Sequence, residues 1–167
     1  SSEVSSQGGD VTITAGTTFQ PGATSTYSTI GSGKLEVTSS GATGTWNASN
    51  VAFTATTVTG SLLLKSNGSS LQAGASTITT GGGDLELNAA TSISTNTAAQ
   101  VRVTAGAGTL KILGVTSLSL GTNSFATTTG GAIDLVASGL TGTWTANLGS
   151  TISSGGGAIT ATATGGA

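Results

Sequence analysis

One spacing dominates this sequence: a glycine-rich turn followed by an apolar–x–apolar triplet recurs about every 25 residues. The first apolar residues of successive occurrences, here called the anchors, are 23 to 27 positions apart. The seven anchors are Val11, Leu35, Leu62, Leu85, Leu110, Ile133 and Ile159. A motif repeated at this spacing along the whole chain indicates a stack of similar units rather than a single compact core.

Each repeat contains two further apolar segments after its anchor. The second begins 8 to 11 residues later, at Phe19, Trp46, Leu71, Ile93, Leu118 and Trp144. The third includes Tyr27, Phe53, Ile78, Val101, Phe125 and Ile152. Apolar residues alternate with polar ones in these segments, which is typical of strands because successive side chains point to opposite faces. We therefore expect three short strands per repeat.

The pattern predicts an all-β fold, a right-handed parallel β-helix (β-solenoid) of about six coils of 23–27 residues. A single repeat cannot bury its apolar face, whereas stacked coils close a continuous core. The preferred hand of parallel crossovers favours a right-handed coil. We expect one solenoid domain over residues 9–167, ending in an incomplete seventh coil, and an N-terminal extension over residues 1–8. A β-sandwich is the alternative, because its strands also alternate with turns every 8–12 residues.

The repeat also predicts which side chains form the core. Stacking places equivalent apolar residues above one another, in the order Val11, Ile13, Leu35, Val37, Leu62, Leu64, Leu85, Leu87, Leu110, Ile112, Ile133, Leu135 and Ile159. The position between the two apolar residues of each triplet faces outward. In three successive coils it holds Glu86, Lys111 and Asp134, an outer charge ladder of alternating sign that stabilises neighbouring strands.

Composition excludes several classes of chemistry. Thr, Ser, Gly and Ala fill 108 of the 167 positions, charged residues are 6%, and Cys, His and Met are absent. Thiolate and imidazole ligands, nucleophiles and bases are therefore missing, and we expect no enzyme activity, no cofactor and no metal. Four Lys and Arg residues form no basic cluster, which argues against nucleic-acid binding. No apolar run reaches 18 residues, so we expect no membrane insertion.

Two residue pairs are candidate sites. Asp84 and Glu86 lie two apart, and paired carboxylates serve glycoside hydrolysis, but a solvated, salt-bridged face is the favoured interpretation. Trp46 and Trp144 stand in almost identical contexts, Gly-Thr-Trp after Gly-x-Thr. Their rings are suited either to stacking on a sugar or to packing inside the wider coils, and packing is favoured.

The glycine-led segments resemble those of haemagglutination-repeat proteins, the filamentous-haemagglutinin-like adhesins of bacteria. The resemblance is carried by three segments, Gly-Gly-Asp-Val-Thr-Ile-Thr-Ala-Gly from Gly8, Gly-Gly-Gly-Asp-Leu-Glu-Leu from Gly81 and Gly-Gly-Ala-Ile-Asp-Leu from Gly130. It implies a right-handed parallel β-helix, export from the cell, and a role in surface fibres, adhesion or biofilm matrix. The coils are longer than that family's commonest repeat.

These observations favour a non-enzymatic, extracellular structural or adhesive protein: a β-solenoid rod that forms or decorates a bacterial surface fibre or biofilm matrix. The expected partners are further copies stacked head to tail and a host or matrix glycan. An ice-binding solenoid is one alternative, suggested by Thr12-Ile13-Thr14 and by the alternating threonines from Thr160 to Thr164. A carbohydrate-binding module is the other.

Overall fold

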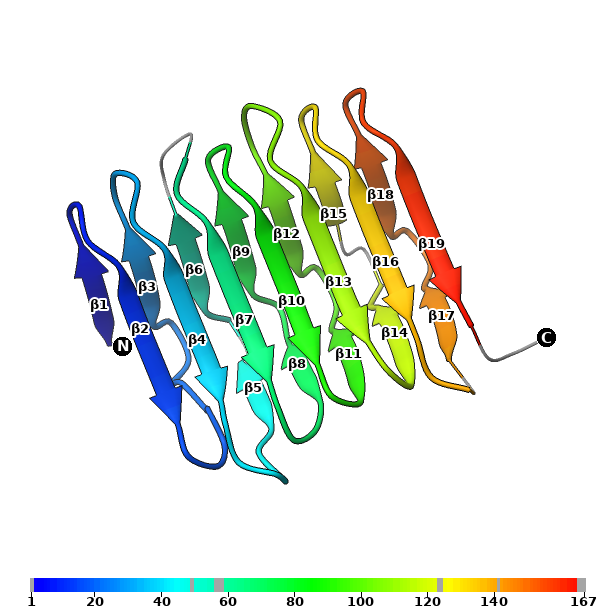
Figure 1. Ribbon diagram of the computed structural model, residues 1–167, viewed down its shortest axis with the longest axis horizontal. Helices are drawn as coiled ribbons and strands as arrows, with labels where there is room; N and C mark the ends of the chain where they lie inside the picture. Colours follow the sequence, from blue (N-terminus) through cyan, green and yellow to red (C-terminus); the bar gives the residue numbers. More distant parts are fainter. Residues whose placement is uncertain (1, 49, 56–58, 123–124, 141, 165–167) are drawn as a thin grey trace.

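A computed structural model describes residues 2–48, 50–55, 59–122, 125–140 and 142–164. The regular structure in these residues consists of strands arranged in three parallel sheets (Figure 1). Sheet A contains β1 (Glu3–Ser6), β3 (Thr26–Thr29), β6 (Ala52–Ala55), β9 (Thr77–Thr80), β12 (Gln100–Val103), β15 (Phe125–Thr128) and β18 (Thr151–Ser154). Sheet B contains β2 (Val11–Ala15), β4 (Leu35–Ser39), β7 (Leu62–Ser66), β10 (Leu85–Ala89), β13 (Leu110–Gly114), β16 (Ile133–Ala137) and β19 (Ile159–Ala163). Sheet C contains β5 (Trp46–Ala48), β8 (Leu71–Ala73), β11 (Ser92–Thr95), β14 (Ser117–Leu120) and β17 (Thr143–Ala146).

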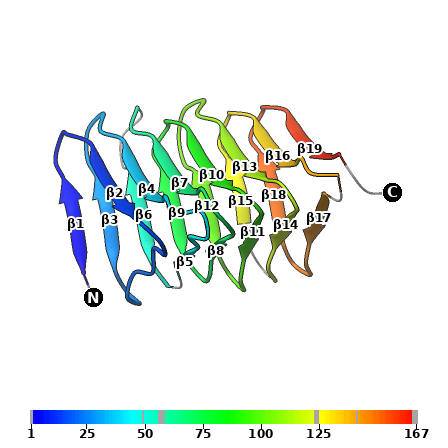
Figure 2. The same cartoon turned by 60° about the horizontal axis from the view of Figure 1, so that its bottom comes forward.

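The chain visits the sheets in the order B, C, A and back to B, once per coil, so the predicted β-solenoid is confirmed. In Figure 1 the strands of sheet B descend along the front and those of sheet A rise behind them, while the coil advances from left to right. This sense of rotation is right-handed, as expected. Figure 2 shows the strands of sheet C side by side along one side of the rod.

The register confirms the predicted coil lengths. Each anchor pairs with the anchor of the next coil, from Val11 with Leu35 to Ile133 with Ile159. The second apolar column is also continuous: Phe19 bridges Trp46, and the pairing runs on through Leu71, Ile93 and Leu118 to Trp144. All these pairings are parallel and join strands one coil apart. The alternative β-sandwich is therefore wrong.

The core is a thin column of side chains between the three sheets. The predicted core residues from Leu35 to Leu135 are each at most 2% exposed. The prediction is wrong at Ile159, which is 49% exposed because no coil covers β19 within the described residues. Ile13, on the first strand of sheet B, is only half-buried and packs against the core from its edge.

Two further expectations need correction. Residues 3–6 of the predicted N-terminal extension form β1, which pairs in parallel with β3 and places Val4 beside Tyr27. The solenoid therefore begins before residue 9. In the third apolar column, Ala126 rather than Phe125 pairs with Val101 and Ile152. The alternation in Phe125-Ala126-Thr127 cannot be assigned from hydrophobicity alone, since Ala and Phe are both apolar.

A glycine stands two residues before every anchor. These glycines are Gly9, Gly33, Gly60, Gly83, Gly108, Gly131 and Gly157. The reason is close approach rather than unusual backbone angles. A Cβ on Gly83 would stand 2.7 Å from the carbonyl carbon of Gly60 and closer still to its oxygen, and Gly33, Gly108, Gly131 and Gly157 meet the preceding coil in the same way. The glycine-rich turn of the sequence therefore sets how closely successive coils stack.

Candidate functional site

The outward face of sheet B carries the predicted charge ladder. Glu86, Lys111 and Asp134 are successive partners in the register. The structure brings their backbones together, but Lys111 forms no ion pair with either carboxylate, and Glu86 Oε1 instead accepts a hydrogen bond from Asn88 Nδ2 at 2.9 Å. An ion pair does join Lys34 Nζ to Glu36 Oε2 at 2.7 Å. The ion pair observed on this face therefore joins two residues that are close in sequence rather than residues of successive coils.

The aspartates that precede two of the anchors connect successive coils. Asp84 Oδ1 accepts hydrogen bonds from the backbone N–H and the hydroxyl of Thr109, each at 2.8 Å. Asp10 Oδ1 accepts one from the backbone N–H of Lys34 at 2.7 Å. The bonds from Thr109 lower the pKa of Asp84, with a smaller contribution from Lys111, against a partial desolvation that raises it. This carboxylate is thus an ionised corner clamp rather than a proton donor.

Asp84 and Glu86 also border a shallow hollow on sheet B. It has a volume of about 180 Å³, and Lys34, Ser61, Leu62 and Leu63 complete its lining. The two carboxylates therefore share a surface, as their spacing predicts. The neighbours of Asp84 hold it ionised, and the general acid of a glycosidase needs the opposite shift, a raised pKa.

Buried or half-buried hydroxyls close the turns from sheet A to sheet B. The hydroxyls of Thr29 and Thr80 donate to the carbonyl oxygens of Gly33 and Gly83 at 3.1 and 2.8 Å, and those of Thr128 and Ser154 make the equivalent bonds to Gly131 and Gly157. These four residues occupy one register column and precede the next anchor by five or six positions. Ala55 and Val103 stand in the same column and precede the next anchor by seven positions. A hydroxyl therefore accompanies the shorter turns.

The two tryptophans lie in different environments. Trp46 is fully buried in an aromatic cluster, with ring centroids 5.5 Å from Phe19 and 5.2 Å from Phe53. Its Nε1 has no hydrogen-bond partner among the residues that the structure describes. Trp144, on β17 near the C-terminal end of the rod, is half-buried and packs against the core. A sugar can therefore reach only Trp144, and Trp46 is a packing residue.

The threonine segments considered for ice binding lie far apart. Thr12 and Thr14 are on β2, and Thr160 and Thr162 are on β19, the two outer strands of sheet B. Between them the outward column holds Glu36, Leu63, Glu86, Lys111 and Asp134. They do not form one continuous threonine face.

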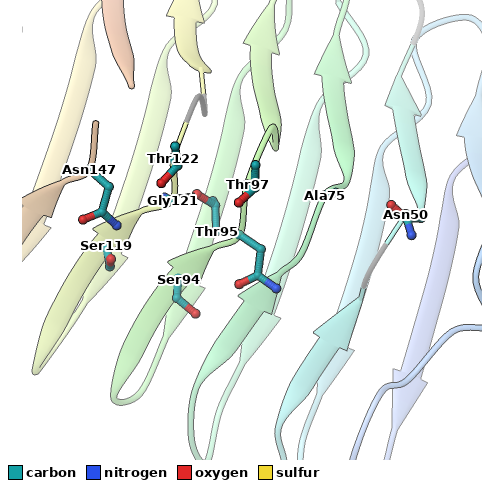
Figure 3. A pocket seen from close by; sticks show the side chains of 10 residues that line it. Asn50, Ala75, Ser94, Thr95, Thr97, Ser119, Gly121, Thr122 and Asn147 are labelled. Carbon is teal, nitrogen blue, oxygen red and sulfur yellow. Dashed lines mark hydrogen bonds between the residues drawn. The ribbon is translucent and has the colours of Figure 1, made fainter. Parts of the chain in front are cut away.

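A groove at the corner between sheets C and A was not predicted from the sequence. It has a volume of about 590 Å³ and receives residues from five successive coils (Figure 3). Its polar lining includes Asn50, Ser94, Thr97, Ser119, Thr122 and Asn147. Asn50 has a φ of 55°, in the left-handed region that Asn tolerates better than most residues. The groove cannot be predicted from sequence patterns, because it depends on the path of the backbone through the turns between sheets C and A.

Other kinds of site were sought in the part of the chain that the structure describes. No three Asp and Glu side chains come together there in a way that could hold a metal ion. Nor do the described residues include a helix capable of crossing a membrane.

Neither the protein-family models, nor the curated proteins, nor the solved structures gave a match to this chain.

Proposed function

We propose that this chain is a structural rod: a non-enzymatic, extracellular β-solenoid segment of a bacterial surface fibre or matrix, extended by stacking copies head to tail. The main support is the register, which stays unbroken from β2 to β19 with equivalent side chains in each column. A rod of this kind adds length with each coil while the core stays continuous. The resemblance to haemagglutination-repeat segments supports the cell-surface location.

The first and last coils carry the same side-chain columns. Ser6, Gly9 and Val11 occupy the column positions of Ser154, Gly157 and Ile159. A second copy set on β18 and β19 would therefore continue the hydroxyl, glycine and anchor columns. Gly9 also has the small size that close stacking on Gly157 requires, as at the other coil contacts.

The outer edge of β19 is suited to receive such a coil. All five of its residues are exposed, and Ile159 leaves half of its side chain uncovered. Unpaired N–H and C=O groups on a strand edge recruit further strands. A contact between two different surfaces that does not close on itself produces a filament.

Electron microscopy of the purified protein at increasing concentration tests this proposal. We expect filaments of uniform width with an axial repeat of about 34 Å, which is seven strand spacings of ~4.8 Å. Ile159→Lys places a charge in the anchor column and should abolish the filaments. Thr160→Lys adds the same charge to the same strand, but outside that column, and should preserve them.

Two results would overturn the proposal. Short single rods at every concentration would show that β18 and β19 do not accept another copy. Filaments of Ile159→Lys as long as those of the unmodified chain would show that association uses another surface.

A further inference from the structure

The corner groove between sheets C and A runs along the rod. Its lining begins with Asn50 before β6 and ends with Asn147 after β17, with Ala75, Thr97 and Thr122 from the coils between them. Five coils at ~4.8 Å per step make the groove about 19 Å long. Figure 3 shows the lining side chains distributed over successive coils rather than gathered at one point. A ligand that fills this groove must be elongated and parallel to the rod axis.

The described lining residues carry no charge. They are Asn, Ser and Thr side chains, together with one alanine and one glycine. Ser94 and Ser119 are register partners on neighbouring strands of sheet C, and both are half-buried. Within the described residues, the hydroxyls of Ser94, Ser119 and Thr97 and the amide of Asn147 make no hydrogen bond to protein. Amides and hydroxyls both donate and accept hydrogen bonds. The groove therefore offers a ligand both donors and acceptors that are not used by the protein.

The floor of the groove is fixed. Thr95 is buried, and its Oγ1 accepts a hydrogen bond from the backbone N–H of Gly121 in the next coil at 2.9 Å. The carbonyl of Gly121 in turn accepts the hydroxyl of Ser150 at 2.7 Å. Three successive coils are thus linked beneath the polar lining. A preformed site of this kind loses little conformational entropy when a ligand binds.

The uncharged lining continues onto sheet C. Its outward column reads Asn47, Gln72, Ser94, Ser119 and Thr145 in register. Sheet B differs, since its hollow is bordered by Lys34, Asp84 and Glu86. Among the described lining residues, an anionic ligand finds no cation to offset its desolvation, and a cationic ligand finds no carboxylate. The groove therefore selects for a neutral ligand.

Peptides are a poorer fit than polyols. The backbone groups of β8, β11 and β14 already pair with the strands of neighbouring coils, so an extended peptide cannot add to a free edge here. The described lining residues also include no large apolar side chain that would hold a peptide's side chains. A sugar ring presents several hydroxyls that each donate and accept, matching the lining.

We propose that this groove binds a linear, neutral polysaccharide lying along the rod. The contacts are hydrogen bonds from the hydroxyls of Ser94, Thr97 and Ser119 and from the amides of Asn50 and Asn147. The inference concerns the side of the rod, whereas the proposed head-to-tail contact concerns its ends. Each can therefore fail without the other.

Native affinity electrophoresis tests it, with gels containing a soluble mixed-linkage β-glucan, a galactomannan or the anionic polygalacturonate. Mobility is corrected with gels that contain no polysaccharide. We expect at least one neutral polymer to retard the protein and polygalacturonate not to do so. Thr97 is exposed, and the larger side chain of Thr97→Arg would fill the groove. We expect this variant to bind the polymer at least tenfold more weakly, as measured from its retardation. Thr12→Arg is the matched control, an exposed threonine on sheet B.

A double variant, Ser94→Ala with Ser119→Ala, removes two hydroxyls while keeping the groove open, and should also weaken binding. Unchanged thermal unfolding midpoints verify that the variants fold. Absence of retardation by both neutral polymers overturns the proposal, as does equal retardation of Thr97→Arg and the unmodified protein. Stronger retardation by polygalacturonate would assign the site to acidic polymers. Self-association lost in Thr97→Arg, without polysaccharide binding, would assign the groove to lateral contact between rods.

Discussion

Asp84 and Thr109 stand at equivalent corners of successive coils, and one carboxylate oxygen of Asp84 accepts both the backbone N–H and the hydroxyl of Thr109. The two bonds hold these two coils together just before the paired strands β10 and β13 begin. The aspartate therefore stabilises the stacking of the coils, although its spacing from Glu86 in the sequence makes the two carboxylates a candidate acidic pair.

Asp84→Ala should lower the free energy of unfolding by about 1 kcal/mol at pH 7, which is below the usual range for bonds to a charged group, because much of the carboxylate faces solvent. The folded pKa of Asp84 lies below its ordinary value of 3.8. Its stabilisation is therefore present above that value and is lost as the pH falls through the folded pKa. Denaturant unfolding at pH 7 and at pH 2 should show the difference between the two proteins shrinking in acid. A difference that stays constant would contradict this account.

Gly83→Ala should destabilise the rod by about 3 kcal/mol, the upper range for overpacking, because its Cβ overlaps the backbone of Gly60. Gly156→Ala is the control, since a Cβ there meets nothing within 4 Å. Thermal unfolding of both variants measures the contrast. Equal midpoints for the two would mean that the coils can separate to admit a methyl group.

Thr80→Val should cost about 1 kcal/mol, since it removes the hydrogen bond to the carbonyl oxygen of Gly83. The branched side chain itself fits, because Val103 occupies the same register position in the next coil. Urea unfolding gives the free-energy change. No loss of stability would show that water replaces the hydroxyl at this turn.

Trp46→Ala should cost about 4 kcal/mol, since the ring is fully buried among Phe19, Tyr27 and Phe53. Trp144→Ala should cost clearly less, because its ring is only half-buried at the end of the rod. Unfolding followed by fluorescence of the remaining tryptophan measures both. Equal losses of stability in the two variants would mean that the Trp144 ring is more deeply buried than its position on β17 indicates.

Lys111→Glu should destabilise sheet B by about 0.5 kcal/mol. The new carboxylate would lie in register between those of Glu86 and Asp134, so that three like charges would be adjacent. Lys111→Gln should have a smaller effect. Since repulsion between exposed charges is screened, added salt should reduce the difference between the two variants. A difference that does not respond to salt would exclude an electrostatic cause.

The coil can be predicted from the sequence because every coil of the solenoid requires the same residue types at equivalent positions. The anchors Leu35 to Ile133 and the second apolar residues Phe19 to Trp144 face the core in every coil, and apolar periodicity reports burial directly. The glycines before the anchors recur for a related reason: Gly33, Gly83, Gly108, Gly131 and Gly157 each lie too close to the preceding coil to carry a Cβ. The ladder of Glu86, Lys111 and Asp134 follows from the same spacing.

Elsewhere the pattern is ambiguous. Phe125 and Ala126 are both apolar, and only pairing with Val101 places Ala126 in the core column. Val4 stands alone among polar residues, so β1 is recognised by its pairing with β3 rather than by periodicity. Ile159 carries an anchor pattern but lacks a coil above it in the described structure, which leaves its side chain exposed.

The sequence by itself determined the coil length, the parallel register and the apolar columns, because each depends on residue type at a fixed interval. The tertiary structure alone decided how the corners meet. The clamp from Asp84 to Thr109, the difference in burial between Trp46 and Trp144, and the groove from Asn50 to Asn147 depend on distances between coils. Those distances arise from backbone paths through turns of unequal length, which hydrophobic periodicity does not encode.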